Sequence, residues 1–195
     1  DTITINAQDS TVSASASALE SVYNVGYNIY AESIAIDAEG AAQTSIDLRA
    51  SSFIASASVD TESGQKGTVS SVGINAESDT SEPSTASFVE IVLDSTTIDV
   101  DSDLEGEGYG ETVALGLLAT SNAQYGDTRI EIDISGGSVD VSATSNSSFQ
   151  AQDNSAHSTA ILASASDSGY GSVVSINVDG GAEVNSYASG IDAIA

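Results

Sequence analysis

Residues 132–141 read IDISGGSVDV, and the pattern within them recurs along the chain. Two isoleucines, Ile132 and Ile134, alternate with polar residues before the glycine pair Gly136-Gly137, and two valines alternate with polar residues after it. Strict alternation over a short run is typical of a half-buried β-strand, because successive side chains point to opposite faces. The stretch therefore predicts two strands joined by a tight glycine corner.

Similar alternation returns at spacings of 41 to 45 residues. Three sets of apolar residues follow this spacing: Ile5, Leu48, Ile91, Ile132 and Ile176; Val12, Phe53, Ile98, Val139 and Val184; and Ile29, Ile74, Leu117 and Ile161. Repeats of this length stack, because each unit needs its neighbour to bury its apolar face. We expect about four to five units with three strands in each, separated by polar loops such as Ser102–Glu111 and Thr144–His157.

Two all-β architectures accommodate the repeat. In a parallel β-solenoid (β-helix), each unit is one coil, and equivalent residues stack about 4.8 Å apart. In an antiparallel β-sandwich, Gly136-Gly137 and Gly180-Gly181 are two-residue hairpin turns. Asp9-Ser10 and Asp94-Ser95 stand at the equivalent earlier corners and fit such a turn poorly, because it needs positive φ twice. We therefore expect the solenoid.

The composition argues against several classes of protein. The chain has 29 acidic residues and 3 basic ones, a net charge of −26 that repels nucleic acid and anionic lipid. Without cysteine, the chain has no disulfide framework, thiolate metal site or cysteine nucleophile. No run approaches the roughly 18 apolar residues of a membrane helix. We expect neither a nucleic-acid partner nor membrane insertion.

The repeat and the polar texture extend from one end of the sequence to the other. We expect residues 1–195 to form a single repetitive β domain, since no linker or shift in composition divides them. The sequence begins at Asp1 without Met and stops within the strand-like run Gly190–Ala195. A fragment or a processed form of a larger protein is therefore expected.

The richest acidic segment supplies the candidate metal ligands. These are Asp99, Asp101, Asp103, Glu105 and Glu107. Ca²⁺ prefers oxygen ligands, so it is the candidate ion. The segment opens like an EF-hand loop, but Leu104 stands where that loop needs glycine, and Gly110 where it needs a bidentate glutamate. Calcium would therefore need an irregular site, and a solvated acidic loop is the alternative.

Stacking of equivalent units also predicts ladders of outward carboxylates. The two expected ladders are Asp47-Glu90-Glu131 and Asp99-Asp140. Like charges on neighbouring strands destabilise a sheet, and Arg49 and Arg129 each lie two residues from a member of the first ladder. We interpret the arginines as relief of this repulsion.

The sequence offers little support for catalysis. His157 is the single histidine and falls in a polar segment. The chain contains no Gly-x-Ser-x-Gly and no His-Glu-x-x-His motif. Glycan-active solenoid enzymes also use basic or aromatic side chains, which are scarce in this chain. We expect that the protein is not an enzyme.

The alternation of Ala, Ser, Asp, Gly, Val and Ile, as in residues 132–141, resembles the repetitive β-solenoid regions of large bacterial secreted or surface proteins. Examples are filamentous-haemagglutinin-like adhesins and autotransporter passengers. The resemblance spans nearly the whole chain, and no catalytic residue is carried over from it. It implies a secreted or cell-surface protein of a bacterium or archaeon, and the acidic surface suits a saline environment.

Together these features predict an extracellular structural or adhesive scaffold. Such a scaffold would associate with copies of itself into filaments, or present loops to a surface glycan or protein. A calcium-dependent glycan- or protein-binding module is the alternative. A glycan-active enzyme with a solenoid fold is the third hypothesis.

Overall fold

The structure is a computed structural model that describes residues 1–19, 28–82, 85–147, 154–167, 171–189 and 192–194. All regular secondary structure in these residues is β-strand, apart from turns and bends, and every strand pairing is parallel. The all-β prediction is therefore confirmed, and the antiparallel sandwich is wrong. No helix in these ranges is long and apolar enough to cross a membrane.

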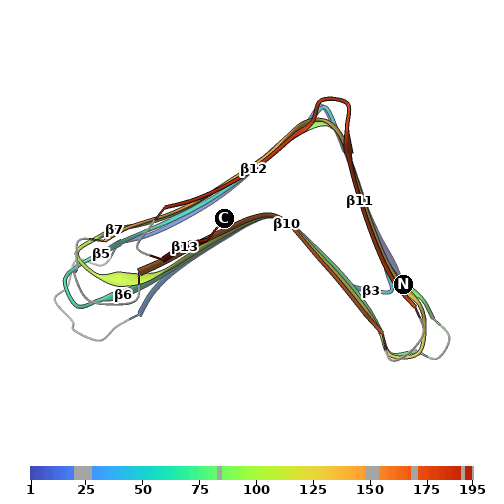
Figure 1. The fold of residues 1–195 in the computed structure, drawn as a ribbon, viewed down its shortest axis with the longest axis horizontal. Helices are drawn as coiled ribbons and strands as arrows, with labels where there is room; N and C mark the ends of the chain where they lie inside the picture. The colour runs from blue at the N-terminus through green and yellow to red at the C-terminus, as the bar shows by residue number, and fades with distance from the viewer. Residues whose placement is uncertain (20–27, 83–84, 148–153, 168–170, 190–191, 195) are drawn as a thin grey trace.

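The strands form two sheets that face each other as two bent layers (Figure 1). Sheet A contains β1 (Thr2–Gln8), β2 (Thr11–Leu19), β4 (Gln43–Arg49), β5 (Ser52–Thr61), β7 (Ser87–Gly106), β9 (Thr128–Ser147), β11 (Ser172–Asp179) and β12 (Glu183–Ser189). Sheet B contains β3 (Asn28–Ala41), β6 (Lys66–Thr80), β8 (Tyr109–Ala123), β10 (Asn154–Asp167) and β13 (Asp192–Ile194).

The chain passes through the two sheets in successive units. Each unit crosses sheet A in two segments and returns through sheet B: β1-β2-β3, β4-β5-β6, β7-β8, β9-β10 and β11-β12-β13. In the third and fourth units the two sheet A segments are one long strand, and Thr96 of β7 pairs with Gly137 of β9 within the corner. The expected three strands per unit are therefore seen in the first, second and fifth units.

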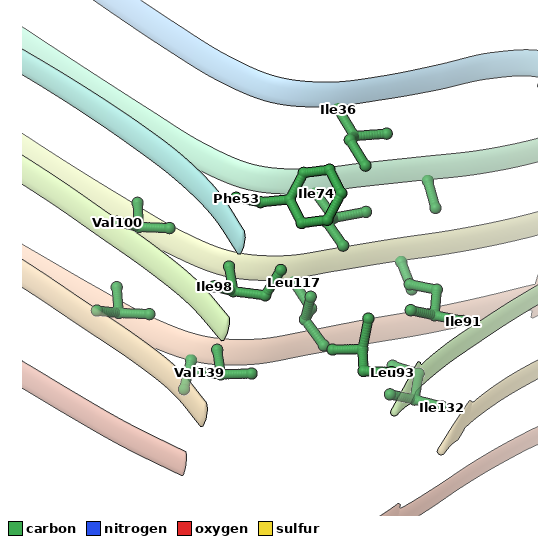
Figure 2. Close-up of a cluster of buried hydrophobic side chains, with 14 of the residues drawn as sticks. Ile36, Phe53, Ile74, Ile91, Leu93, Ile98, Val100, Leu117, Ile132 and Val139 are labelled. Carbon is green, nitrogen blue, oxygen red and sulfur yellow. The ribbon is translucent and has the colours of Figure 1, made fainter. Parts of the chain in front are cut away.

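The strand register confirms one of the three predicted apolar columns in full. Val12, Phe53, Ile98, Val139 and Val184 are consecutive partners in the ladder. Phe53, Ile98 and Val139 are completely buried, and they meet Ile74 and Leu117 of sheet B between the layers (Figure 2). This column is the centre of the core.

Each of the other two columns has one wrong member. Ile46, not Leu48, pairs with both Ile5 and Ile91. Both Ile46 and Leu48 point inward, so alternation alone does not distinguish them. In sheet B, Ile36 rather than Ile29 pairs with Ile74.

Sheet A turns sharply between its two segments in every unit. Asp9, Ala50 and Ser95 adopt positive φ angles of 51°, 46° and 52° at this corner, and Gly136 and Gly137 adopt 70° and 77°. The glycine pair is therefore a corner within sheet A and not a hairpin turn. The segments of β9 on both sides of it pair in parallel with β7. Glycine suits the corner because positive φ costs other residues energy.

Sheet B bends at a second line of small residues. A Cβ added to Gly73 would lie 2.6 Å from both Cγ2 of Ile98 and the carbonyl oxygen of Gly116. Gly73 and its neighbour Ile74 are both buried, so the in–out alternation of β6 changes phase at this point. The missing side chain lets the two sheets approach closely where sheet B bends.

The polar segments expected as loops are largely strands. β7 continues to Gly106 and β8 begins at Tyr109, so little of Ser102–Glu111 is irregular. The second expected loop is strand at both ends, His157 lies within β10, and residues 148–153 of this prediction lie outside the described part of the chain. In this part of the chain, inward serines and threonines alternate with outward polar side chains, which hides the apolar signal of a strand.

Candidate functional site

The candidate metal ligands lie on the outer face of the second sheet A segment. We call this surface the outer acidic face: the outward side of β2, β5, Thr97–Gly106 of β7, Ser138–Ser147 of β9, and β12. Asp99, Asp101, Asp103 and Glu105 alternate with buried residues on β7, so all four point outward. Glu107 follows the strand, and its N–H donates to the carbonyl oxygen of Thr61 over 2.7 Å.

Hydroxyl groups flank the central carboxylates of this row. Asp101 pairs in register with Ser56 on one side and Ser142 on the other. Asp103 pairs in the same way with Ser58 and Thr144. Neighbouring strands lie about 4.8 Å apart, so hydroxyls replace carboxylates at the distance where like charges would repel most strongly.

The middle of the row is partly shielded from water. Burial raises the pKa of Asp101, and the nearby carboxylate of Asp99 adds to the effect. Burial likewise raises the pKa of Asp103, with further contributions from Glu105 and Asp101. One carboxylate oxygen of Asp103, Oδ1, is buried and has no hydrogen-bond partner. A negative charge on Asp103 is therefore unfavourable in this fold.

A shallow hollow opens beside Asp103 and is lined in addition by Ser17, Ser58, Asp60 and Glu105. It brings carboxylates of two neighbouring units, on β5 and β7, to one place. However, successive outward residues of a strand lie about 6.6 Å apart, whereas calcium ligands lie about 2.3–2.6 Å from the ion. Within the described ranges, no three His, Asp or Glu side chains are placed to hold one ion. Calcium binding stays a prediction.

The expected carboxylate ladders are only partly correct. Glu90 pairs with Glu131 and Asp99 pairs with Asp140, as predicted, but Asp47 pairs with Val92. The partner of Glu90 in the second unit is Ser45, whose Oγ donates to Oε2 of Glu90 over 3.0 Å. The repulsion expected in the first ladder is therefore reduced to one pair of glutamates.

Two of the three basic residues bind carboxylates on their own strands. Nε and Nη2 of Arg49 donate to the two carboxylate oxygens of Asp47, each over 2.9 Å, and Arg129 pairs with Glu131. The hydrogen bond from Arg49 holds the pKa of Asp47 below its usual range. The predicted charge relief is found, although it acts within strands.

Asparagine side chains provide a second form of charge relief that the sequence reasoning missed. Nδ2 of Asn75 donates to Oδ1 of Asp37 over 2.9 Å and to Oε1 of Glu39 over 2.6 Å. Nδ2 of Asn185 donates to Oδ1 of Asp140 over 2.8 Å. Each asparagine is in the unit next to its acceptors, so a correct register would have revealed these contacts.

No family model matches the sequence, and no curated protein or solved structure matches it either. Function is therefore inferred from the geometry of the chain itself. The features that bear on function are the in-register columns, the outer acidic face, and the face of sheet B that points away from sheet A.

Proposed function

We propose that the chain is a parallel β-solenoid whose coils are the successive units, and that it serves as an extracellular structural or adhesive scaffold. The observation that carries the proposal is the unbroken column from Val12 through Phe53, Ile98 and Val139 to Val184. A column that keeps its β-branched or aromatic filling while the surface varies is the pattern of a stacked array. Such arrays extend along one axis without altering their cross-section.

The dimensions favour a segment of a longer assembly. Five stacked units rise only about 20 Å at the usual strand spacing, which is less than the length of the long strands that cross each unit. Elongation therefore needs further units in line with these. On β11, Val174, Ile176 and Val178 are exposed although they lie opposite buried isoleucines of β9, and the other edge of β11 has no strand partner within the described residues. Both features favour association with further copies.

The charge is consistent with a surface location. A net charge of −26 keeps an extended particle soluble and prevents adhesion to nucleic acid and anionic lipid. In a saline medium the Debye length is about 10 Å or less, so salt screens the repulsion between acidic residues that lie farther apart than this. A secreted or cell-surface protein of a bacterium or archaeon meets these conditions.

Electron microscopy of the native source, with antibodies against this chain, tests the scaffold. We expect gold label at regular intervals along fibres or surface projections. Label confined to discrete soluble particles would contradict the proposal.

One observation favours a calcium-dependent binding module as the second candidate. Asp103, Asp60 and Glu105 line the same hollow, and Oδ1 of Asp103 has no donor there. A cation that bound in the hollow would relieve the repulsion between these carboxylates and would order the outer acidic face.

A further inference from the structure

The face of sheet B that points away from sheet A carries three aliphatic side chains and a threonine in a row along its bend. Ile34, Val72, Leu115 and Thr159 are successive partners on β3, β6, β8 and β10, immediately before the bend. Figure 1 shows that the open face of sheet B lies on the concave side of the molecule. The bend therefore turns this row into the floor of the concavity.

A second row lies just beyond the bend. Leu118 of β8 pairs with Leu162 of β10, and their partners in the earlier units are Asn75 and Asp37. Leu162 is 45% exposed, and Leu118 is half-buried. We call the two rows the crease, which consists of Ile34, Val72, Leu115, Thr159, Leu118 and Leu162.

Apart from Val72, which is only 6% exposed and belongs to the buried residues, the crease is separate from the core. The sheet B residues that meet sheet A are their neighbours on the opposite face, such as Ile74, Ala114 and Leu117. The side chains of Ile34, Leu115 and Leu118 are in neither buried cluster, and they keep part of their surface open to solvent. Partly exposed aliphatic side chains gathered at the bend of an otherwise polar face are typical of a binding surface.

Acidic side chains border the crease on both sides. Glu32 and Glu111 lie toward one end of the strands, and Asp37, Glu39 and Glu77 lie toward the other. Asn75 holds the carboxylates of Asp37 and Glu39 in place by its two hydrogen bonds. In the described residues of sheet B, Lys66 is the single Lys or Arg. The rim is therefore strongly negative.

We propose that the crease binds a cationic amphipathic α-helix of a partner protein. A helix laid along the crease would place one apolar residue per turn of about 5.4 Å over side chains that recur about every 4.8 Å. Four strands span about 14 Å, which corresponds to about ten helical residues. Lysine or arginine on the flanks of the helix would meet the acidic rim.

The charge of the rim selects this partner over other apolar ones. An acidic helix would be repelled, and an anionic membrane surface would be repelled by the net charge of −26. A role for the crease in adhesion rests on the proposed function of the chain as an adhesive scaffold. The binding of a peptide to the crease does not depend on that function. Failure to bind would leave the scaffold untouched, and failure to find fibres would leave the crease untouched.

Titration of the whole chain with a fluorescent Leu/Lys peptide of about 14 residues, designed as an amphipathic helix, tests the proposal. We expect saturable binding with a gain of peptide helicity, and weaker binding at high salt. A shuffled peptide of the same composition, which lacks the apolar stripe, should bind at least about tenfold more weakly. Absence of binding, or equal binding of both peptides, would overturn the proposal.

The chain supplies its own matched substitutions. Leu115→Thr and Leu118→Asn introduce the residues that Thr159 and Asn75 already place in the same rows, so the strands tolerate them. The double variant should lose at least about tenfold in affinity, because two apolar contacts disappear. Val92→Asp is the control on sheet A, where Asp47 and Asp133 already occupy the row, and it should bind like the parent chain.

A charge variant provides an independent route should the leucine variants unfold. Glu32→Gln with Glu77→Gln keeps the shape of the rim and removes two charges. We expect weaker binding and a reduced dependence on salt. Unchanged affinity and salt dependence would overturn the proposal, as would a leucine double variant that stays folded and binds as tightly as the parent chain.

Discussion

Asn185 donates a hydrogen bond from Nδ2 to Oδ1 of Asp140, 2.8 Å away on the neighbouring strand. Asn75 does the same for Asp37 and Glu39 on the face of sheet B that points away from sheet A. In a chain with 29 acidic and 3 basic residues, uncharged donors thus neutralise part of the repulsion between stacked units. The pairing register of the strands determines which carboxylates lie beside an asparagine and are stabilised by it.

Replacing the bridging amide by a carboxylate tests this form of charge relief. Asn75→Asp places a third acid beside Asp37 and Glu39 and removes both hydrogen bonds. We expect a loss of about 1–2 kcal/mol in the free energy of unfolding at neutral pH. The loss should shrink in high salt, because part of it is repulsion between exposed charges. Denaturant unfolding at low and high salt measures both, and a loss independent of salt would contradict the electrostatic explanation.

The corner of sheet A is tested by two alanine substitutions with the same backbone angle. Gly137 and Gly181 both have φ of 77°, but a Cβ at Gly137 would clash with the backbone of Thr96, whereas nothing lies within 4 Å of one at Gly181. Gly181→Ala should cost about 1 kcal/mol of unfolding free energy from positive φ alone. Gly137→Ala should cost several times more, or prevent folding. Equal losses in denaturant melts would show that the stacked corner is absent.

The outer acidic face predicts a stability that depends on pH. Asp103 has a raised pKa because of burial and of neighbouring Glu105 and Asp101. A carboxyl whose pKa is higher in the folded chain than in the unfolded one binds its proton more tightly when folded. The associated stability is fully present below the unfolded pKa and is lost as the pH rises through the folded pKa. Asp103→Asn should therefore raise the Tm at pH 7 and change it little below the unfolded pKa of about 4.

Asp47→Asn is a control whose expected change in Tm has the opposite sign, because the pKa of Asp47 is lowered in the folded chain. Arg49 lowers the pKa of Asp47, so the stability contributed by this pair is present above the unfolded pKa and is lost as the pH falls through the folded pKa. The variant should lower the Tm slightly at pH 7. Thermal melts of both variants across this range measure the difference. A decrease in Tm at pH 7 for Asp103→Asn would contradict the assignment.

Calcium separates the scaffold from the second candidate. If the hollow beside Asp103 binds calcium, millimolar Ca²⁺ should raise the Tm at fixed ionic strength, as any ligand specific for the folded state does. The rise should disappear in Asp103→Asn with Glu105→Gln, both of which line the hollow. An equal rise with Mg²⁺ would indicate general screening, and an unchanged Tm would exclude the calcium module.

The sequence was sufficient for the fold class and for the central column, but not for the register of every strand. The repeat spacing pairs Val12 with Phe53 correctly, and each lies three residues after a corner residue with positive φ, Asp9 or Ala50. The spacing selects Ile29 in place of Ile36, which lies seven residues further on, because both are buried on the same strand. The change of phase near Gly73 leaves no signal in a count of alternating residues.

The sequence predicts a strand at Asp99 correctly, whereas it wrongly predicts a loop at Asp103 and Glu105. The segment Ser102–Glu111 reads as a loop because Ser102 stands where the alternation after Ile98 and Val100 requires an apolar residue. Ser102 is buried, and its Oγ donates to the carbonyl oxygen of Val113 over 2.7 Å. A satisfied buried hydroxyl is indistinguishable from a loop serine in the sequence. The crease was missed because the bend that defines it depends on the packing between the sheets.

The most direct test of the account is cross-linking across the outer acidic face, which a cysteine-free chain makes unambiguous. Asp101 and Ser142 are partners in register, at a strand spacing that a disulfide can bridge. Thr144 is offset from this register by two residues, so its Cα lies about 8 Å from that of Asp101, too far for a disulfide. Asp101→Cys with Ser142→Cys should oxidise to an intramolecular disulfide, detected by mass spectrometry. Asp101→Cys with Thr144→Cys should stay reduced under the same conditions. A disulfide in the offset variant, and none in the paired one, would contradict the parallel in-register stack.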